Sequence, residues 1–350
     1  MYPNKRKAAV FYGVNDIRIE ELDMPQVGAN EVLIQNKAVG ICGSDVHFYK
    51  EGQIGPYVPK PGHILGHECA GIIIAVGEEV KDKKVGNKVA IEPGIPCGCC
   101  ELCKKGKYNL CRKMLFMSHP DPLHEGAFAE YIVQPAEFTY LLADHISYEE
   151  GAMAEPLSVA MQTIKRGHLT PGDTIAILGS GPIGLCILLA VKAAGASEVY
   201  NTDQYDYRVE FAKKFGATDA FNSDKENVIE NIMSATNNRG VDLVIETAAQ
   251  AQTYEQSTIL ATRGGRIVLV GMSSETHFPI SVFDIIDKEL DISSVFRYDN
   301  VYGVAVSLIN NGSVPIKKII THHFDFKDVS KALDLVHVRG DNVIKAVVTF

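Results

Sequence analysis

Two different hydrophobic patterns divide the chain near residue 155. Before this point, apolar and polar residues alternate, as they do on antiparallel strands that bury one face. Turn residues in Gly13-Val-Asn15 and Pro25–Asn30 separate the first three runs. The strands predicted in this part are Lys7–Tyr12, Ile17–Leu22, Glu31–Ala38, Gly66–Gly77, Lys88–Glu92 and Ala127–Gln134. The N-terminal part is therefore predicted to be a β-rich domain.

After residue 155, short β-type runs alternate with helical patterns. The predicted strands are Thr174–Leu178, Glu198–Thr202, Ala217–Phe221, Asp242–Glu246, Gly265–Val270 and Leu290–Phe296. The predicted helices are Ser158–Arg166, Pro182–Ala194, Tyr207–Phe215, Asn227–Ala235 and Thr253–Ala261. Strands and helices that alternate in this way form a doubly wound parallel sheet.

The last 50 residues return to a mixed pattern, with helices predicted at Val301–Asn310 and Val329–Arg339 and a strand at Val343–Phe350. A chain of 350 residues exceeds the usual size of one domain. We therefore expect an α/β protein in which residues 1–155 and 297–350 form one domain, and residues 156–296 form a nucleotide-binding domain inserted into it.

A glycine-rich turn stands between the first strand and the first helix of the predicted doubly wound sheet. It reads Gly179-Ser-Gly181-Pro-Ile-Gly184, and Asp203 follows it by 19 residues at the end of the next strand. This arrangement binds a dinucleotide, because the glycines admit the pyrophosphate to the helix N-terminus and the acid accepts hydrogen bonds from the ribose. Asp203 would repel a 2′-phosphate and favours NAD, whereas Arg208 leaves NADP open.

Five cysteines fall within residues 97–111, and four of them follow the spacing C-x2-C-x2-C-x7-C. Four thiolates on a short loop can enclose a structural zinc ion; these are Cys97, Cys100, Cys103 and Cys111. The alternative is an iron–sulfur cluster, but the bacterial ferredoxin run places its last cysteine three residues on and a proline after it. Here Arg112 follows Cys111, so zinc is favoured. We expect Cys99 to be a spectator.

A second, open metal site is suggested by three segments, which are Gly40-Ile-Cys42-Gly-Ser44-Asp45-Val-His47, Gly66-His67-Glu68 and Ala154-Glu155-Pro156. One thiolate, one imidazole and a carboxylate leave a coordination position for water or substrate, as catalytic zinc requires. The alternative is that His67 is an ordinary structural histidine and that Glu155 only begins a helix. Separation along the chain leaves open whether these residues meet.

The composition of the chain limits the kinds of molecule that it can bind. The net charge of −9 without a basic block argues against nucleic acid, and no apolar stretch reaches membrane-spanning length. The start of the chain lacks the apolar core of a signal peptide, and cysteines in such a chain are more often reduced than paired. We expect a cytoplasmic protein that acts on small molecules.

At this point the chain resembles the zinc-dependent medium-chain alcohol dehydrogenases, and within that family its polyol branch, the sorbitol (L-iditol) and xylitol dehydrogenases. The resemblance covers essentially the whole chain. Besides the four-cysteine loop, it rests on GICGSDVHFY (40–49), LGHECAG (65–71), VAIEPG (89–94), EGAMAEPLSVA (150–160), LGSGPIGL (178–185) and VFRYDN (295–300). It implies a GroES-like catalytic domain and a Rossmann domain that binds NAD.

The resemblance also implies roles for single residues. Cys42, His67 and Glu68 would hold the catalytic zinc, with Glu155 either a ligand or the group that holds the zinc-bound water. Ser44 and His47 would relay the proton outward. Implied substrate contacts are Phe48, Glu155, Arg297 and Tyr298. Implied cofactor contacts are Gly179, Gly181, Ile183, Gly184, Asp203, Arg208, Val270, Gly271, Met272, Val295, Phe296 and Arg297.

The implied reaction is hydride transfer from a polyol, assisted by zinc, to NAD, with a ketose as product. The tyrosine that lines the pocket in sorbitol dehydrogenases aligns with Phe48, so one polar contact is missing unless Tyr49 replaces it. The alternatives are L-threonine 3-dehydrogenase and 2,3-butanediol dehydrogenase in the same family, and, from another class, an NAD-binding protein with an iron–sulfur cluster. The family pattern further implies a homo-oligomer paired near Ser293–Phe296, a tetramer rather than a dimer.

Overall fold

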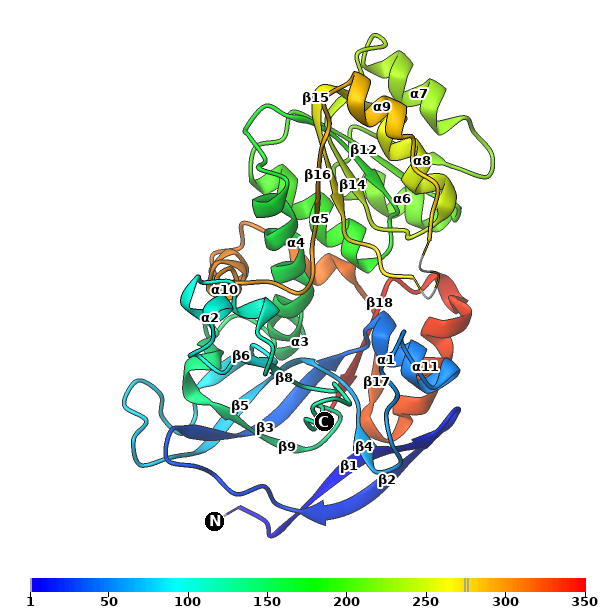
Figure 1. The fold of residues 1–350 in the computed structure, drawn as a ribbon. Coiled ribbons are helices and arrows are strands. Elements are labelled where there is room, and N and C mark those ends of the chain that lie inside the picture. Colours follow the sequence, from blue (N-terminus) through cyan, green and yellow to red (C-terminus); the bar gives the residue numbers. More distant parts are fainter. Residues whose placement is uncertain (1, 274, 276) are drawn as a thin grey trace. The chain divides into compact units, whose positions relative to one another are not determined.

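The computed structural model describes residues 2–273, 275 and 277–350. The chain separates into two compact units, one formed by the residues up to Glu155 together with Asp299–Phe350, the other by Pro156–Tyr298 (Figure 1). The second crossing between the units falls between Tyr298 and Asp299, two residues after the boundary drawn from the sequence. We refer to them as the first and the second unit.

The first unit is built mainly from antiparallel strands. Its larger sheet has the order β10-β6-β5-β3-β18-β17, with β9 also paired to β3, and a smaller sheet has the order β2-β1-β4. Only β17 and β18 pair in parallel within these two sheets. The strands are β1 (Lys5–Gly13), β2 (Asp16–Asp23), β3 (Glu31–Gly40), β4 (His63–Ile64), β5 (Glu68–Val76), β6 (Lys88–Ile91), β7 (Gly94–Ile95), β8 (Leu115–Phe116), β9 (Tyr131–Pro135), β10 (Thr139–Leu141), β17 (Ile320–Asp325) and β18 (Lys345–Thr349).

Short helices close the first unit around these strands. They are α1 (Gly43–Glu51), α2 (Glu101–Lys104), α3 (Tyr148–Ala152), α10 (Tyr302–Asn310) and α11 (Val329–Val338). A buried apolar core joins α1 and α11 to the sheets through residues such as Phe48, Phe128 and Leu333. Strand β18 follows the second unit in the chain, yet it pairs with β3.

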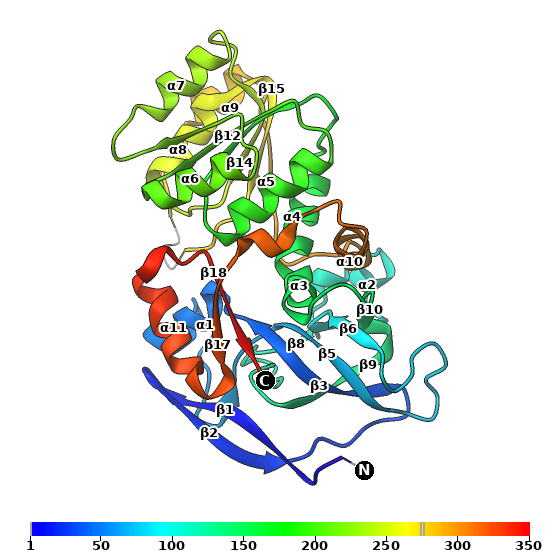
Figure 2. The ribbon, with the colours of Figure 1, turned by 180° about the vertical axis from the view of Figure 1, so that it is seen from behind.

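The second unit is a parallel six-stranded sheet, counted over the described residues, in the order β13-β12-β11-β14-β15-β16. This is the doubly wound order, in which right-handed crossovers place helices on both faces (Figures 1 and 2). The strands are β11 (Thr174–Leu178), β12 (Glu198–Asp203), β13 (Asp219–Asn222), β14 (Val241–Glu246), β15 (Ala261–Leu269) and β16 (Asp291–Ser294). The helices are α4 (Ala154–Arg166), α5 (Pro182–Ala193), α6 (Asp206–Lys214), α7 (Val228–Ala235), α8 (Ala251–Leu260) and α9 (Val282–Asp287).

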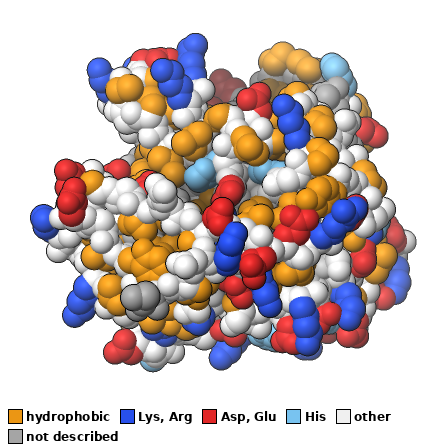
Figure 3. Space-filling view, turned by 90° about the horizontal axis from the view of Figure 1, so that it is seen from below, with side chains coloured by type: hydrophobic (Ala, Val, Ile, Leu, Met, Phe, Trp, Pro, Cys, Tyr) orange, Lys and Arg blue, Asp and Glu red, His pale blue; other side chains and the backbone are white. Residues whose placement is uncertain are grey.

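The predicted fold class is confirmed, with an antiparallel β-rich unit and a doubly wound parallel one. The sequence analysis assigned no element to α1, α9 or β17, and it began β9 four residues too early. No helix in the described part of the chain is long and apolar enough to cross a membrane. On the face shown in Figure 3, acidic and basic side chains are interspersed, in keeping with a chain that has no basic block.

Candidate metal and cofactor sites

Three side chains with metal-binding atoms converge in the first unit, although they come from separate segments. Cys42 immediately precedes α1, while His67 and Glu68 stand at the start of β5. One ligand atom from each lies within 4.8 Å of the other two. A thiolate, an imidazole and a carboxylate are the three protein ligands typical of a catalytic zinc, which keeps its fourth position open. The residues brought together here therefore fit such an ion.

Asp45 supports two of these ligands from the first turn of α1, where it is fully buried. Its Oδ2 accepts a hydrogen bond from the Cys42 N–H at 3.0 Å, and its Oδ1 lies 3.7 Å from Nδ1 of His67. A carboxylate that faces one ring nitrogen leaves the other for a metal. The sequence analysis gave Asp45 no role, although an acid three residues into a helix is a recognisable capping signal.

The side chain of Lys345, in β18, also lies beside this group of ligands, although it is distant from them in the sequence. Its ammonium forms an ion pair with Oε2 of Glu68 and donates a hydrogen bond to the carbonyl of Ile41 at 2.8 Å. Gly40 makes room for this pair, because a Cβ there would stand 2.2 Å from Oε2 of Glu68. No local motif marks Lys345, so sequence reasoning did not find it.

The negative charges around His67 favour a cation bound at this site. Burial lowers the pKa of its imidazole, but the negative charges of Cys42 and Asp45, with a smaller contribution from Glu155, raise it to about 10. Glu155 is buried in the first turn of α4 and belongs to the first unit. It is not one of the three residues whose ligand atoms converge, but the charge of its carboxylate reaches His67.

The two residues predicted to relay a proton lie on α1. Ser44 is half-buried in the first turn. His47 is 47% exposed, and its Nδ1 lies 2.7 Å from Oε1 of Glu51 one turn later. The imidazole is thus held in one orientation at the surface, where it can exchange a proton with water.

Phe48 and Tyr49 are both buried in the apolar core that includes α1. The pKa of Tyr49 is raised by burial and then by the charges of Asp334 and Asp16, which lie in α11 and β2. The charged groups that act on its hydroxyl are therefore not the metal ligands. Replacement by Tyr49 of the polar contact that Phe48 lacks stays a prediction.

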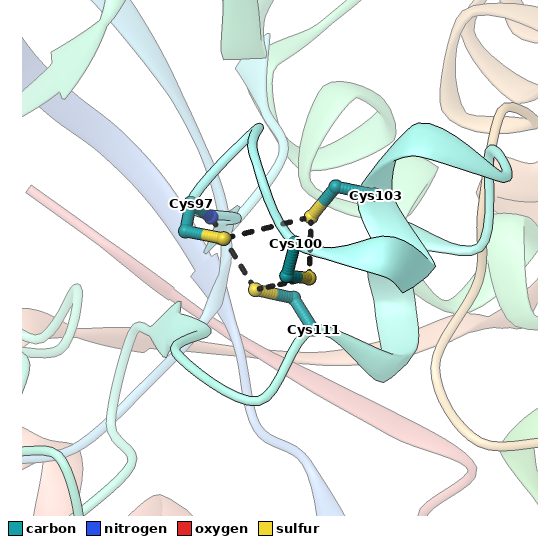
Figure 4. A group of neighbouring side chains, drawn as sticks. All are labelled: Cys97, Cys100, Cys103 and Cys111. Carbon is teal, nitrogen blue, oxygen red and sulfur yellow. Dashed lines mark hydrogen bonds between the residues drawn. The ribbon is translucent and has the colours of Figure 1, made fainter.

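The four cysteines of the predicted structural zinc site also converge (Figure 4). The Sγ–Sγ distances are 3.5 Å for Cys100 and Cys103, 3.9 Å for Cys97 and Cys103, and 3.9 Å for Cys100 and Cys111. The edge of a tetrahedron with Zn–S bonds of about 2.3 Å is roughly 3.8 Å, so the cluster has the size of a zinc site. Cys99 is exposed and stands outside this group of four.

Backbone groups of the loop stabilise negative sulfur. N–H groups of Cys99 and Cys100 lower the pKa of the Cys97 thiol to about 6. Burial and hydrogen bonds to Cys100 and Cys111 raise the pKa of Cys103 instead, to about 12. Four thiolates at this separation repel each other unless a cation lies between them, which is the function of zinc in such a loop.

The glycine-rich turn of the second unit has the close packing that its motif requires. A Cβ at Gly184 would lie 2.0 Å from the carbonyl oxygen of Gly179, so helix and strand can approach only with glycine there. Gly181 is the N-cap of α5, Pro182 occupies the first turn, and Ile183 follows it. The unpaired N–H groups at this helix start are suited to a pyrophosphate.

Asp203 ends β12 beside this turn. Its Oδ2 accepts a hydrogen bond from the N–H of Ser180 at 2.9 Å, and its Oδ1 accepts one from the N–H of Tyr205 at 3.1 Å. Nη1 of Arg208 lies 3.5 Å from the same carboxylate, and the guanidinium also lies 5.2 Å from the centre of the Tyr205 ring. The Arg208 charge is therefore next to the acid that would select the ribose.

The other predicted cofactor residues follow strands β15 and β16 at the carboxyl edge of the sheet. N–H groups of Val270 and Gly271 donate to the carbonyl of Glu246, and the N–H of Val295 donates to that of Leu269. Such loops at the carboxyl ends of parallel strands form the dinucleotide site in doubly wound folds. Met272 and Phe296 are exposed large hydrophobic side chains of these loops.

Arg297 and Tyr298 end the second unit. Arg297 has a φ of +54°, a left-handed conformation that is rare for a residue with a side chain. Its guanidinium carbon lies 4.8 Å from the centre of the Phe296 ring. Tyr298 is 3% exposed.

Two family models match the chain. Residues 28–144 match the alcohol dehydrogenase GroES-like domain, and residues 182–311 match the zinc-binding dehydrogenase family. The first stretch contains seven of the predicted zinc ligands, and the second begins in the glycine-rich turn.

Similar proteins extend over the whole chain. Sorbitol dehydrogenase from Bacillus subtilis is 43% identical over 95% of this chain and 94% of its own. D-xylulose reductase A from Aspergillus oryzae is 38% identical over 97% of this chain and 95% of its own. A solved Escherichia coli alcohol dehydrogenase, complexed with cofactor NADH, is 32% identical with a TM-score of 0.91, covering 99% of this chain and 100% of its own.

Proposed function

This chain belongs to the zinc-dependent alcohol dehydrogenase family, and from that premise we propose that it is a polyol dehydrogenase that uses NAD. The first unit is the catalytic domain and the second unit is the NAD-binding domain. The substrate is a polyol such as sorbitol, xylitol or L-iditol, and the product is the corresponding ketose.

One observation carries most of this proposal. Cys42, His67 and Glu68 form an open three-ligand group in a chain that is 43% identical to a sorbitol dehydrogenase. The second named relative is a D-xylulose reductase, named for the reverse reaction, the reduction of a ketose. Zinc in such a group supplies a Lewis acid for the alcohol oxygen, and NAD supplies the hydride acceptor.

The residues of the chain then have the following roles. Asp45 fixes the orientation of His67 and the position of the Cys42 backbone. Glu155 holds a water molecule or the substrate hydroxyl by a hydrogen bond. Ser44 and His47 carry the alcohol proton toward solvent, with the His47 ring held by Glu51.

Binding of NAD is assigned to the second unit. The start of α5 receives the pyrophosphate, and Asp203 accepts hydrogen bonds from the adenosine ribose. Because a 2′-phosphate would meet the Asp203 carboxylate, NAD is preferred to NADP. The loops after β15 and β16 receive the nicotinamide part, and Arg297 and Tyr298 contact the additional hydroxyls of the polyol.

Initial-rate measurements with a substrate panel test the proposal. Sorbitol, xylitol, L-iditol, L-threonine and 2,3-butanediol are each offered with NAD and with NADP, and NADH absorbance is followed. We expect turnover with a polyol and NAD, by a colourless protein that carries zinc in both clusters. Turnover of only L-threonine or butanediol would move the protein to another branch, and visible iron–sulfur absorbance would overturn the zinc assignment.

A homo-oligomer is part of the proposal. Strand β16 is an edge strand of the parallel sheet, with Ile292 39% exposed and Phe296 40% exposed. An unpaired edge with exposed apolar side chains can pair with the same edge of a second chain. We expect a tetramer rather than a dimer, and light scattering after gel filtration measures it.

The proposed location is the cytoplasm. None of the eight cysteines, all of which lie in the described part of the chain, forms a disulfide, which suits a reducing compartment. Fractionation of cells with an antibody to the protein tests this location.

A further inference from the structure

We propose that the four-cysteine loop is a positioning element for the substrate-binding segment, and that Tyr108 and Asn300 are the residues that connect them. The proposal rests on the proposed function for the roles of Arg297 and Tyr298. Tyr108 lies on the loop between Cys103 and Cys111. Asn300 follows Tyr298 by two residues and Arg297 by three.

Two hydrogen bonds join Asn300 to the loop. Its backbone N–H donates to the Oη of Tyr108 at 2.9 Å, and its side-chain Nδ2 donates to the carbonyl of Gly106 at 2.7 Å. Both partners lie on the short stretch between the third and the fourth cysteine. The position of Asn300 therefore depends on the conformation that this loop adopts.

Tyr108 is itself fixed by a buried acid. Its hydroxyl donates to Oε1 of Glu92 at 2.7 Å, while Tyr140 donates to Oε2 of the same carboxylate at 2.8 Å. Glu92 is 1% exposed and directly follows β6. Because the Tyr108 proton points at Glu92, the oxygen lone pairs are free to accept the Asn300 N–H.

The segment needs an anchor of this kind. Arg297 and Asn300 both have a φ of +54°, and two non-glycine residues in the left-handed region so close together persist only where surrounding contacts hold them. The chain after Asn300 is also held, since the Tyr302 hydroxyl donates to the carbonyl of Ile91 at 2.7 Å. With consecutive Cα atoms about 3.8 Å apart, fixing Asn300 confines the Tyr298 backbone to within about 7.6 Å of it.

Two matched variants distinguish a role of Tyr108 in positioning Asn300 from a general contribution of hydrogen bonds to Glu92. Tyr108→Phe and Tyr140→Phe each remove one hydrogen bond to Glu92, but only Tyr108→Phe removes the acceptor of Asn300. Asn300→Gly keeps the left-handed backbone and removes the bond to Gly106. Asn300 is exposed, so Asn300→Gly tests the anchor even if Tyr108→Phe, at a half-buried position, folds poorly.

Two readouts are measured on the zinc-loaded enzyme. Tyr108→Phe and Asn300→Gly should raise the KM for the polyol by roughly three- to tenfold, with kcat and the Kd for NADH within about twofold of the parent. In hydrogen exchange with mass spectrometry, the Asn300 amide should exchange roughly fivefold faster or more in Tyr108→Phe. Tyr140→Phe should change neither quantity.

Other results would overturn the inference. These are equal effects of Tyr108→Phe and Tyr140→Phe, or parallel losses in kcat, polyol KM and NADH affinity. If the parent enzyme oxidises no polyol, the proposed function fails, but the exchange rate of the Asn300 amide still decides whether the loop anchors this segment.

Discussion

Lys345 and Glu68 form an ion pair in the interior of the first unit, with side chains only 3% and 2% exposed. They are far apart in the sequence and meet because β18 is hydrogen-bonded to β3, whose last residue, Gly40, pairs with Glu68 on the other side. The ammonium thus orients a carboxylate that stands beside Cys42 and His67. A buried charge with one such partner depends strongly on it.

The first prediction concerns this pair. Lys345→Met should leave Glu68 buried without its cation and lower the free energy of unfolding by about 3–5 kcal/mol. The loss should be larger in metal-free protein than in zinc-loaded protein, because zinc also compensates the Glu68 charge. Urea unfolding of both forms measures the two values.

Lys331→Met is the control for that experiment. Lys331 pairs with Asp328 at the surface, with a side chain 73% exposed, and solvent screens such a pair so that it contributes little to stability. Similar losses of unfolding free energy in the two variants would show that burial does not make the Lys345–Glu68 pair more stabilising than an exposed pair.

The second prediction compares two neighbouring cysteines. Cys100→Ser should remove the zinc of the four-cysteine loop and lower Tm, because a structural zinc contributes folding free energy. Cys99→Ser should keep the full zinc content and the parent Tm, since Cys99 stands outside the group of four. Metal analysis and calorimetry measure both, and loss of zinc from Cys99→Ser would assign that thiol to the site.

The third prediction concerns Glu155. Glu155→Ala should lower kcat by roughly a hundredfold or more, the usual range for losing a group that positions or moves a proton. NADH binding, followed by fluorescence titration, should remain intact, since the dinucleotide is assigned to the other unit. Glu137→Ala, at an exposed position, is the control. Unchanged turnover in Glu155→Ala would remove this residue from the mechanism.

The fourth prediction concerns the choice of cofactor. Asp203→Ser should raise the ratio of kcat/KM for NADP to that for NAD by roughly ten- to a hundredfold, because charged hydrogen bonds contribute about 1.5–3 kcal/mol each. Arg208, 3.5 Å from this carboxylate, would then be released to meet the 2′-phosphate. The double variant with Arg208→Ala should lose most of the gain. A ratio unaffected by Asp203→Ser would mean that other residues select the cofactor.

The alternating helices and strands made the second unit predictable from the sequence. Thr174–Leu178 is a buried run, apolar after Thr174 and followed by a glycine, and its predicted bounds agree with β11. Helix α1 escaped prediction because its sequence, GSDVHFYKE, has no single apolar stripe and is fixed by tertiary packing of Phe48 and Tyr49. Strand β17 escaped because its polar sequence, ITHHFD, lies at the edge of a sheet where few side chains are buried.

Some residues of the candidate site could also be predicted from the sequence, and others could not. The four-cysteine loop is local, so its spacing alone identified the group that converges in the structure. Cys42 and Glu68 could be linked only through a family resemblance, because sheet pairing brings their segments together. The roles of Glu155, Arg297 and Tyr298 stay predictions. Lys345 emerged only from a contact that no motif records, and Asp45 stands at a capping position whose role the sequence analysis did not assign.

The late position of β18 in the chain affects the order in which the protein folds during its synthesis. On the ribosome, β3 emerges long before β18, and the whole second unit is synthesised between them. That unit has all its strands in one continuous stretch, so it can fold first, while residues 38–40 at the end of β3 still lack their partner strand β18. Until Lys345 leaves the exit tunnel, Glu68 has no ammonium to orient it. The second unit can therefore complete its fold before Lys345 joins the group formed by Cys42, His67 and Glu68.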